Sequence, residues 1–458
     1  MLQIHDRLYG TLELPDPVWE AATTCPVVLR LREVRMANIP FLSHPSFAHV
    51  DRYEHSLGVA HLAWRWARSA RLPKDEGIAL SLAALYHDGA TPAFGHLFEE
   101  YLRRFGFDHE EVLVQVLEGS SRDLPGSERF QVFLGRQCRL RAILPRAKKS
   151  DSPLTPLAIA DLAAGRGRLG KLIKGDLDLD NIDNVIRASS AMGLLNARRL
   201  LHPYELADAL CLEKDQLKIQ AAGGFAVSQW SEVRRILYEA ILNNQYEFRA
   251  QAALKWAIEE RALEDTQLRH KSAWALTDPE LMFEHLRRSA FSRLLVDRLR
   301  AASPPQLLFS AWLDDLSGLV GPRCGDTIST LCADISELAN AEVYVNYYPD
   351  KRLRPVRLDM TDGSGLFERA GRAGTVGPQS PRAAWSGLIG GIFTSRVERV
   401  QAGGGTGTKA RLSKRAVQLD DLVRILRKHL GCQPRACALR WLGTPDERDT
   451  QLFLISGG

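Results

Sequence analysis

The stretch DRYEHSLGVAHLAWRWA, residues 51–67, predicts a helix that decides the fold. Its apolar positions recur at helical spacing and are Leu57, Ala60, Leu62, Ala63, Trp64 and Trp66. The first turn instead carries Arg52, Glu54 and His55. A helix that packs along most of its length but begins with titratable side chains is expected to turn that first turn toward a polar cleft.

Composition limits the class of protein. The chain has 458 residues, 45% hydrophobic and 25% charged, which is ordinary for globular domains and long enough for two or three of them. A net charge of +5 permits a phosphorylated ligand without marking a nucleic-acid binder. Seven scattered cysteines without a CxxC pair suit a reducing compartment and make a cysteine-based zinc site improbable. With no apolar run of membrane-spanning length and no signal-peptide pattern, we expect a cytoplasmic protein without a membrane role.

The pattern along the chain predicts a mainly α fold in two parts. Helical periodicity dominates from residue 53 to about 120 and returns in later segments, 153–165, from 181 onward, and twice within 231–263. Stretches rich in β-branched and aromatic residues follow, AEVYVNYYP (341–349), RPVRLDM (354–360), CALRWLG (437–443) and TQLFLIS (450–456). We therefore expect an all-α domain over residues 1–302 and a smaller α+β accessory domain over 303–458.

Four potential metal ligands come from three separate segments. They are His55, the doublet His87-Asp88 in ALYHDGATPAFGH, and Asp180 in GDLDLDNIDNVIR. Imidazole and carboxylate together suit a borderline divalent ion such as iron, manganese, zinc or nickel. Adjacent helical residues point ~100° apart, so the doublet can hold one ion only in a crevice where other helices add ligands. Two His and two Asp would leave positions open for water, the arrangement of a catalytic site.

Each of these residues alone is more often a structural group or a helix cap than a ligand. The spaced combination is more specific, because each segment places its candidate beside an apolar helical run. The prediction therefore depends on all four side chains converging.

The same residues resemble a known family. The H…HD…D pattern, with RYEHSLG before the first His and YHDGATPAFGHLFE around the doublet, resembles the HD-domain phosphohydrolases. Within them it is most similar to the branch that contains the deoxynucleoside triphosphate triphosphohydrolases, whose final Asp motif resembles LDLDNIDNVIR. The run LYEAI…RAQAALKWAI…LTDPEL is similar to the helical signature of that branch. The resemblance covers roughly residues 25–300 and implies an HD-domain helical bundle with metal-dependent phosphohydrolase activity.

The resemblance also implies roles for individual residues. His55, His87, Asp88 and Asp180 would hold a divalent ion (Mn, Fe, Zn, Ni or Mg). The residues expected to bind substrate are Arg52, Asp183, Asn184 and Arg187, with Arg52 on a phosphate.

Three further residues would carry the acid-base chemistry. His96 would lie by the α-phosphate, and His109 would protonate the leaving oxygen or position water. Glu99 would pair with His109 and favour its charged form. The structural alternatives are a solvated helix face for Glu99 and a helix start for His109, in FDHEEV.

The sequence departs from the branch at three positions. Thr91 stands where a second histidine usually follows the doublet, and Asn184 and Ala188 replace the Tyr and Asp that recognise the sugar. Losing a charged hydrogen bond to a hydroxyl costs ~1.5–3 kcal/mol. We therefore expect altered sugar specificity, with a ribonucleotide, a modified nucleotide, a monophosphate or another phosphoester as candidate substrates.

Other interpretations stay open at this point. A nucleotide-sensing or nucleic-acid-binding HD module with little or no turnover would explain the three departures. His96 and His109 could ligate a second metal, and an oxygenase at a diiron site would need more ligands than are assigned. The expected partners are a nucleotide or other phosphoester substrate, with a nucleotide effector and homo-oligomer formation plausible and nucleic acid not indicated.

Overall fold

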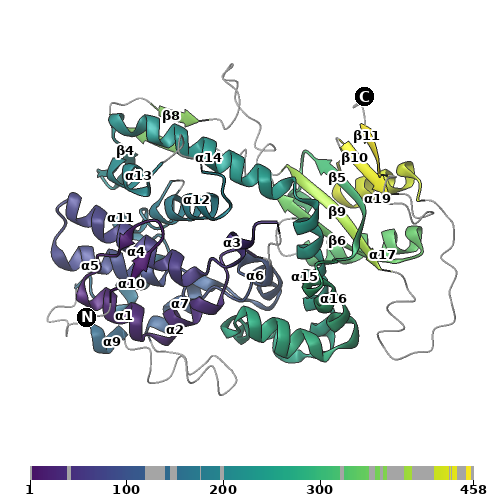
Figure 1. The fold of residues 1–458 in the computed structure, drawn as a ribbon, viewed down its shortest axis with the longest axis horizontal. Helices are drawn as coiled ribbons and strands as arrows, with labels where there is room; N and C mark the ends of the chain where they lie inside the picture. The colour runs from purple at the N-terminus through teal and green to yellow at the C-terminus, as the bar shows by residue number, and fades with distance from the viewer. Residues whose placement is uncertain are drawn as a thin grey trace. The chain divides into compact units, whose positions relative to one another are not determined.

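The computed structural model describes residues 3–38, 43–118, 140–144, 152–175, 177–195, 201–319, 324–349, 356–361, 365–368, 386–394, 417–432, 434, 436–440 and 450–454. The chain divides into two compact units, whose helices and strands are labelled in Figure 1. The first comprises residues 1–237, 269–280 and 355–371. The second comprises residues 238–268, 281–354 and 372–458.

The first unit is organised around two consecutive helices, α4 (Arg52–Ser69) and α5 (Lys74–Tyr86), which pack extensively on each other. Asp51 caps α4 by accepting a hydrogen bond from the Glu54 amide at 2.8 Å. Every residue of α5 from Gly77 to Tyr86 is buried, as expected for a helix that is apolar on all sides. The helix predicted from residues 51–67 is thus confirmed.

Further helices surround this pair. They are α1 (Asp16–Thr24), α2 (Pro26–Leu29), α3 (Pro45–Ala48), α6 (His96–Leu102), α7 (His109–Glu118), α9 (Leu140–Ile143), α10 (Pro156–Ala163), α11 (Gly167–Gly170), α12 (Leu179–Ala191) and α13 (Pro203–Ala209). Helix α10 packs on α5 and α7, while α12 and α13 pack on α4.

The two long helices expected within 231–263 are α14 (Gly224–Leu242) and α15 (Gln245–Glu264). Helix α15 belongs to the second unit.

The region expected to be all-α also contains strands. The strands are β1 (His5–Asp6) and β2 (Gly10–Thr11), which form a hairpin, and β3 (Leu210–Glu213) and β4 (Gln216–Ile219). Lys214 and Asp215 join β3 to β4 with φ angles of +48° and +63°, the left-handed conformation of a tight hairpin turn. The alternation in LCLEKDQLKI was the available signal for this hairpin.

The small sheet of the first unit is completed from far along the chain. Strand β7 (Val356–Met360) pairs with β4 in parallel, and β8 (Gly365–Glu368) pairs with β7. The described part of the RPVRLDM segment, Val356–Met360, is therefore a strand as predicted, but it belongs to the first unit.

The second unit contains a five-stranded antiparallel sheet in the order β11-β10-β5-β9-β6. Its strands are β5 (Gln306–Leu313), β6 (Glu342–Pro349), β9 (Gly387–Thr394), β10 (Ala436–Arg440) and β11 (Thr450–Leu454). Helix α17 (Cys324–Ala339) packs against β6 and against α19 (Leu419–Leu430). Leu331, Val345, Ile389 and Leu426 belong to the core between these elements.

A mainly α fold with a smaller sheet-containing C-terminal region is confirmed. The compact unit that holds the five-stranded sheet also includes α15 and α16 (Ala290–Arg300). The domain boundary between residues 302 and 303 therefore stays a prediction from the change in sequence pattern. Among the described helices, none combines the length and apolar character that a membrane crossing requires.

Candidate metal centre

Four side chains from three helical segments converge in the first unit. His55 lies in the first turn of α4, His87 and Asp88 directly follow α5, and Asp180 lies in the first turn of α12. His55 Nε2 is 3.0 Å from Asp180 Oδ1 and 4.0 Å from Asp88 Oδ2. His87 Nε2 is 3.7 Å from each of the same two oxygens. The convergence that the sequence prediction depends on is therefore present.

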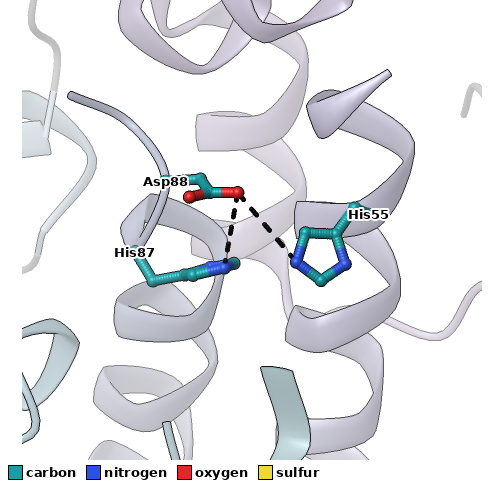
Figure 2. Close-up of side chains that lie close together, drawn as sticks. All are labelled: His55, His87 and Asp88. Atoms are coloured by element: carbon teal, nitrogen blue, oxygen red, sulfur yellow. Dashed lines mark ion pairs between the residues drawn. The ribbon is translucent and has the colours of Figure 1, made fainter. Parts of the chain in front are cut away.

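Three of these side chains form a compact group of potential ligands. One donor atom from each of His55, His87 and Asp88 lies within 4.8 Å of the others. Figure 2 shows the Asp88 carboxylate directed at both imidazoles from one side. Asp180 stands beside them and, with its side chain 32% exposed, is the most accessible of the four candidate ligands.

The hydrogen bonds of the two imidazoles fit a bound cation. His87 Nδ1 donates to the Ala84 carbonyl at 2.7 Å, while its buried Nε2 has no hydrogen-bond partner. His55 Nδ1 donates to Asp183 Oδ1 at 2.7 Å. In both rings Nδ1 is therefore bonded to an outer carbonyl or carboxylate, as in metal-ligating histidines. The opposite nitrogen, Nε2, faces the carboxylates of Asp88 and Asp180.

Asp88 is held at both oxygens. Arg52 Nη1 donates to Asp88 Oδ2 at 2.7 Å, and Thr91 Oγ1 donates to Asp88 Oδ1 at 2.8 Å. Despite desolvation by burial, Arg52 and the two nearby imidazoles hold the pKa of Asp88 well below its usual range. Thr91, which stands where the resembled branch has a histidine, thus orients a candidate ligand.

Asp183 lies behind His55 and is fully buried. Its carboxylate accepts four hydrogen bonds, from His55 Nδ1, Tyr9 Oη, and the Nε and Nη2 of Arg187. Four bonds use the whole accepting capacity of a carboxylate. Burial is outweighed by Arg187 and His55, so the pKa of Asp183 is lowered.

Arg187 is the centre of a buried network formed with Asp6, Glu54 and Asp183. Its side chain is 0% exposed and pairs with Asp183 and, at 2.8 Å each, with Asp6 and Glu54. The sequence prediction placed Asp183 and Arg187 on substrate. That role stays a prediction; in the structure the polar atoms of both residues are engaged by protein groups, and Asp183 bonds to the imidazole of His55.

Gly58, one turn after His55 on α4, makes room for this network. A Cβ atom at that position would lie 2.3 Å from Asp183 Oδ2 and 2.4 Å from Arg187 Nη2. Any larger residue would push the network away from α4. The glycine in RYEHSLG therefore has a packing reason of its own.

A second set of charged side chains, the Glu99 cluster, lies on α6 and at the start of α7. Glu99 accepts from His96 Nδ1 and His109 Nδ1 at 2.7 Å each, and from Arg103 at 2.7 Å. Although burial opposes it, bonding to the two imidazoles lowers the pKa of Glu99. The expected Glu99–His109 pairing is present, and Glu99 is a buried acceptor rather than a solvated residue.

Two of the three positions that differ from the resembled branch, Asn184 and Ala188, lie on α12. Ala188 is buried, and Asn184 is half-buried. Their part in substrate selection stays a prediction.

Comparison with protein families identifies the region that carries these groups. Residues 52–153 match the model described as the HD domain. The chain contains an HD domain. The match begins at Arg52 and includes His55, His87 and Asp88.

Relatives of this HD-domain chain match only part of its length. The deoxynucleoside triphosphate triphosphohydrolase SAMHD1 homolog of Dictyostelium discoideum is 28% identical over 125 residues, 25% of this chain and 24% of the relative. An uncharacterized protein of Methanocaldococcus jannaschii is 26% identical over 216 residues, 46% of this chain and 39% of the relative. The chain thus spans well under half of these curated relatives.

Solved structures share the fold over most of the HD-domain chain. A phosphohydrolase from Bacteroides thetaiotaomicron VPI-5482 matches with a TM-score of 0.56 at 16% identity, over 85% of this chain and 99% of that chain. A hypothetical protein from Aquifex aeolicus matches with a TM-score of 0.55 at 19% identity, over 88% and 98%. At these identities the likeness is one of fold.

Sequence reasoning missed four polar residues around the site. Asp6 and Tyr9 reach the network from the N-terminal hairpin, and their separation of 181 and 174 residues from Arg187 and Asp183 leaves no local pattern. Arg30 and Asp278 hold the loop that follows Asp88. Asp278 lies in the LTDPEL run, so the resemblance marked its segment but not its contact.

Proposed function

We propose that this protein is a metal-dependent phosphohydrolase that cleaves a phosphoester of a nucleotide, with sugar selection altered from that of the deoxynucleoside triphosphate triphosphohydrolases. The observation that carries the proposal is the orphaned, buried His87 Nε2 facing Asp88 and Asp180 beside His55 Nε2. Two imidazole nitrogens and two carboxylate oxygens are a donor set for a borderline divalent ion. The match to the HD domain supports the same assignment.

His55, His87, Asp88 and Asp180 would hold the ion, and the partly exposed Asp180 leaves one side open to substrate. A divalent ion held there would supply Lewis acidity and ionise water near neutral pH. Arg52, beside Asp88, contributes a positive charge that balances a phosphate brought to the site.

The Glu99 cluster supplies the group that handles the leaving oxygen. Because Glu99 accepts the Nδ1 proton of His109, the opposite nitrogen, Nε2, is the atom that can deliver a proton. Arg103 and His96 share the same carboxylate and keep it charged. The resemblance to the triphosphohydrolase branch supports this division between ligands and acid.

The altered specificity is proposed from α12. Asn184 and Ala188 stand where the branch has the Tyr and Asp that contact the sugar. Asn184 lacks the ring that would form a steric wall against the sugar, and Ala188 lacks the hydrogen-bond acceptor, so we expect discrimination against ribose to be weak. The loss of one hydrogen bond to a charged group corresponds to about a 10–100-fold lower affinity for the sugar.

The test is metal analysis joined to turnover. The purified protein is stripped, reloaded separately with Mn²⁺, Fe²⁺, Zn²⁺, Ni²⁺ or Mg²⁺, and assayed for phosphate, diphosphate or triphosphate release from deoxyribo- and ribonucleotides. We expect at least one metal to support turnover that His87→Ala and Asp88→Ala abolish. Metal uptake without turnover on any phosphoester would instead favour the nucleotide-binding module, and no uptake would reject the proposal.

A further inference from the structure

The loop of residues 88–95, between Asp88 and α6, has a conformation that its own sequence does not favour. Phe94 and Gly95 have φ angles of +53° and +54° in succession. A left-handed phenylalanine is rare, and such a residue persists only where its surroundings hold it. The loop must therefore be fixed from outside.

Arg30 holds the first half of the loop. It is 4% exposed, and its Nη2 donates to the carbonyl oxygens of Gly89, at 3.3 Å, and Thr91. Its Nη1 donates to the carbonyl oxygens of Trp274 and Leu276 at 3.2 and 3.1 Å. The planar guanidinium thus joins two chain segments through four carbonyls, which the single ammonium of lysine cannot reproduce.

Asp278 holds the second half. It is 3% exposed; its Oδ1 accepts from the Phe94 amide at 2.7 Å, and its Oδ2 accepts from the Arg35 amide at 3.0 Å. The backbone of Arg35 in turn pairs as an antiparallel β-bridge with the backbone of Asp51, the N-cap residue of α4. The carboxylate therefore ties the strained end of the loop to the start of the helix that bears His55.

Both holding contacts lead to Asp88. The Arg30 contact fixes the backbone of Thr91, whose hydroxyl donates to Asp88 Oδ1. The Asp278 contact fixes the Phe94 amide, and the next residue, Gly95, lies so close to Arg52 that a Cβ atom on it would be 2.4 Å from Nη2. Arg52 Nη1 donates to Asp88 Oδ2. Each oxygen of the candidate ligand is thus oriented through one of the two residues.

We propose that Arg30 and Asp278 are positioning residues of the metal centre, which hold the loop so that Thr91 and Arg52 keep the Asp88 carboxylate directed at the two histidines. The role in metal binding rests on the proposed function. The holding of the loop is a property of the chain itself and can be measured without metal.

The test compares Arg30→Lys and Asp278→Asn with matched substitutions in the second unit. Arg249→Lys alters an arginine that also donates to carbonyls, those of Pro304 and Pro305. Asp265→Asn alters a buried carboxylate that also accepts a backbone amide, that of Gln267. The full-length protein is used, and urea unfolding and circular dichroism check that each variant is folded.

The first readout is amide hydrogen exchange of the metal-free protein. We expect exchange within residues 89–95 to rise about tenfold or more in both loop variants, with the Phe94 amide as the direct reporter, while the centre of α5 is unchanged. The second readout is Mn²⁺ affinity, which should fall about tenfold or more in the same variants and less than about twofold in the controls. Unchanged loop exchange, or equal losses in the controls, would overturn the inference.

A variant that leaves the Arg30 and Asp278 contacts intact separates positioning from simple destabilisation. Thr91→Val removes the hydroxyl that reaches Asp88, so Mn²⁺ affinity should fall without faster loop exchange at Phe94. Combining Arg30→Lys with Thr91→Val should weaken Mn²⁺ binding no further than the larger single effect, because both act through one contact. Full additivity would contradict the proposed route. If the wild-type protein takes up no Mn²⁺ or other ion, the proposed function fails, whereas the exchange result still decides whether the loop is held.

Discussion

Two groups of charged side chains accompany the candidate ligands, and they are built in opposite ways. In the buried network a cation, Arg187, lies at the centre of three carboxylates and is 0% exposed. In the Glu99 cluster an anion lies at the centre, and its partners His109 and His96 are 27% and 65% exposed. In the first group Asp6 and Asp183 are as buried as Arg187, and Glu54, at 27% exposed, is its outer member. In the second group the central carboxylate is buried and the two imidazoles are its exposed members. The comparison separates charges that position ligands from charges that can exchange protons.

Breaking the centre of the buried network should have the largest effect. Arg187→Met leaves Asp6, Glu54 and Asp183 without their shared cation. Removing one partner of a buried ion pair costs about 3–5 kcal/mol, so urea unfolding should show a loss of that size together with lost metal binding.

Arg65→Met is the matched control, since Arg65 pairs with Asp208 while 40% exposed. A surface pair contributes about 0–1 kcal/mol, so this variant should stay near the wild-type free energy of unfolding. Equal losses in the two variants would mean that burial does not distinguish the network.

Substitution in the Glu99 cluster should change activity rather than stability. His109→Gln removes the proposed proton donor, and kcat should fall about 10²-fold or more while the free energy of unfolding changes by less than about 1 kcal/mol. His96→Gln removes a partner of the same carboxylate that is more exposed. We expect a smaller loss of kcat there, and a larger loss for His96 than for His109 would reverse the assignment of the acid.

Gly58→Ala tests how closely the buried network must approach α4. The added methyl group would overlap Asp183 Oδ2, and overpacking of this kind costs about 1–3 kcal/mol. Because Asp183 orients His55, metal affinity should fall as well.

The control lies on the neighbouring helix α5. At Gly77 the nearest atom to an added Cβ is 3.1 Å away, on the ring of Trp64. Gly77→Ala should therefore change stability by less than about 1 kcal/mol and leave metal affinity unaltered. Metal affinity that is equal in the two variants would show that the position of Asp183 does not matter to His55.

The comparison also explains what the sequence could reveal. His55, His87, Asp88 and Asp180 were predictable because each lies beside a recognisable apolar helical run. The pairing of Glu99 with His109 was expected only because the resemblance to the triphosphohydrolase branch implied it. For Asp183 and Arg187, the sequence did not reveal the contacts that they make with His55, Asp6 and Glu54. Helix α12 presents them to the α4 face that Gly58 leaves open, and that fact belongs to the packing of two helices rather than to either sequence segment.

The contacts that were missed share one physical property. Tyr9, Arg30 and Asp278 each bond to a group 59 or more residues away. Arg30 and Asp278 bond to backbone groups, which every residue possesses, so no pattern of side chains announces them. The β3–β4 hairpin was missed for a different reason, because a short alternating segment lay inside a long helical region.

The smallest expected effect concerns the proton on His55 that a bound metal ion would have to displace. Burial alone would lower the pKa of His55, but the hydrogen bonds to Asp180 and Asp183 outweigh it and raise the pKa to about 10. Without metal, His55 is therefore charged at pH 7, and its pairing stabilises the fold below the ordinary pKa of 6.5 and loses that contribution as the pH rises through about 10. Metal uptake at pH 7 should release about one proton from His55, and affinity should strengthen up to about tenfold per pH unit on going from pH 6.5 to 8. Calorimetry in buffers of different ionisation enthalpy measures the release directly.

Two variants test whether Asp183 sets this proton. Because Arg187 still holds Asp183 in place, Tyr9→Phe should alter the number of protons released less than Asp183→Asn, which removes the charged acceptor itself. A proton count of zero in the wild-type protein would show that His55 is neutral before the metal arrives.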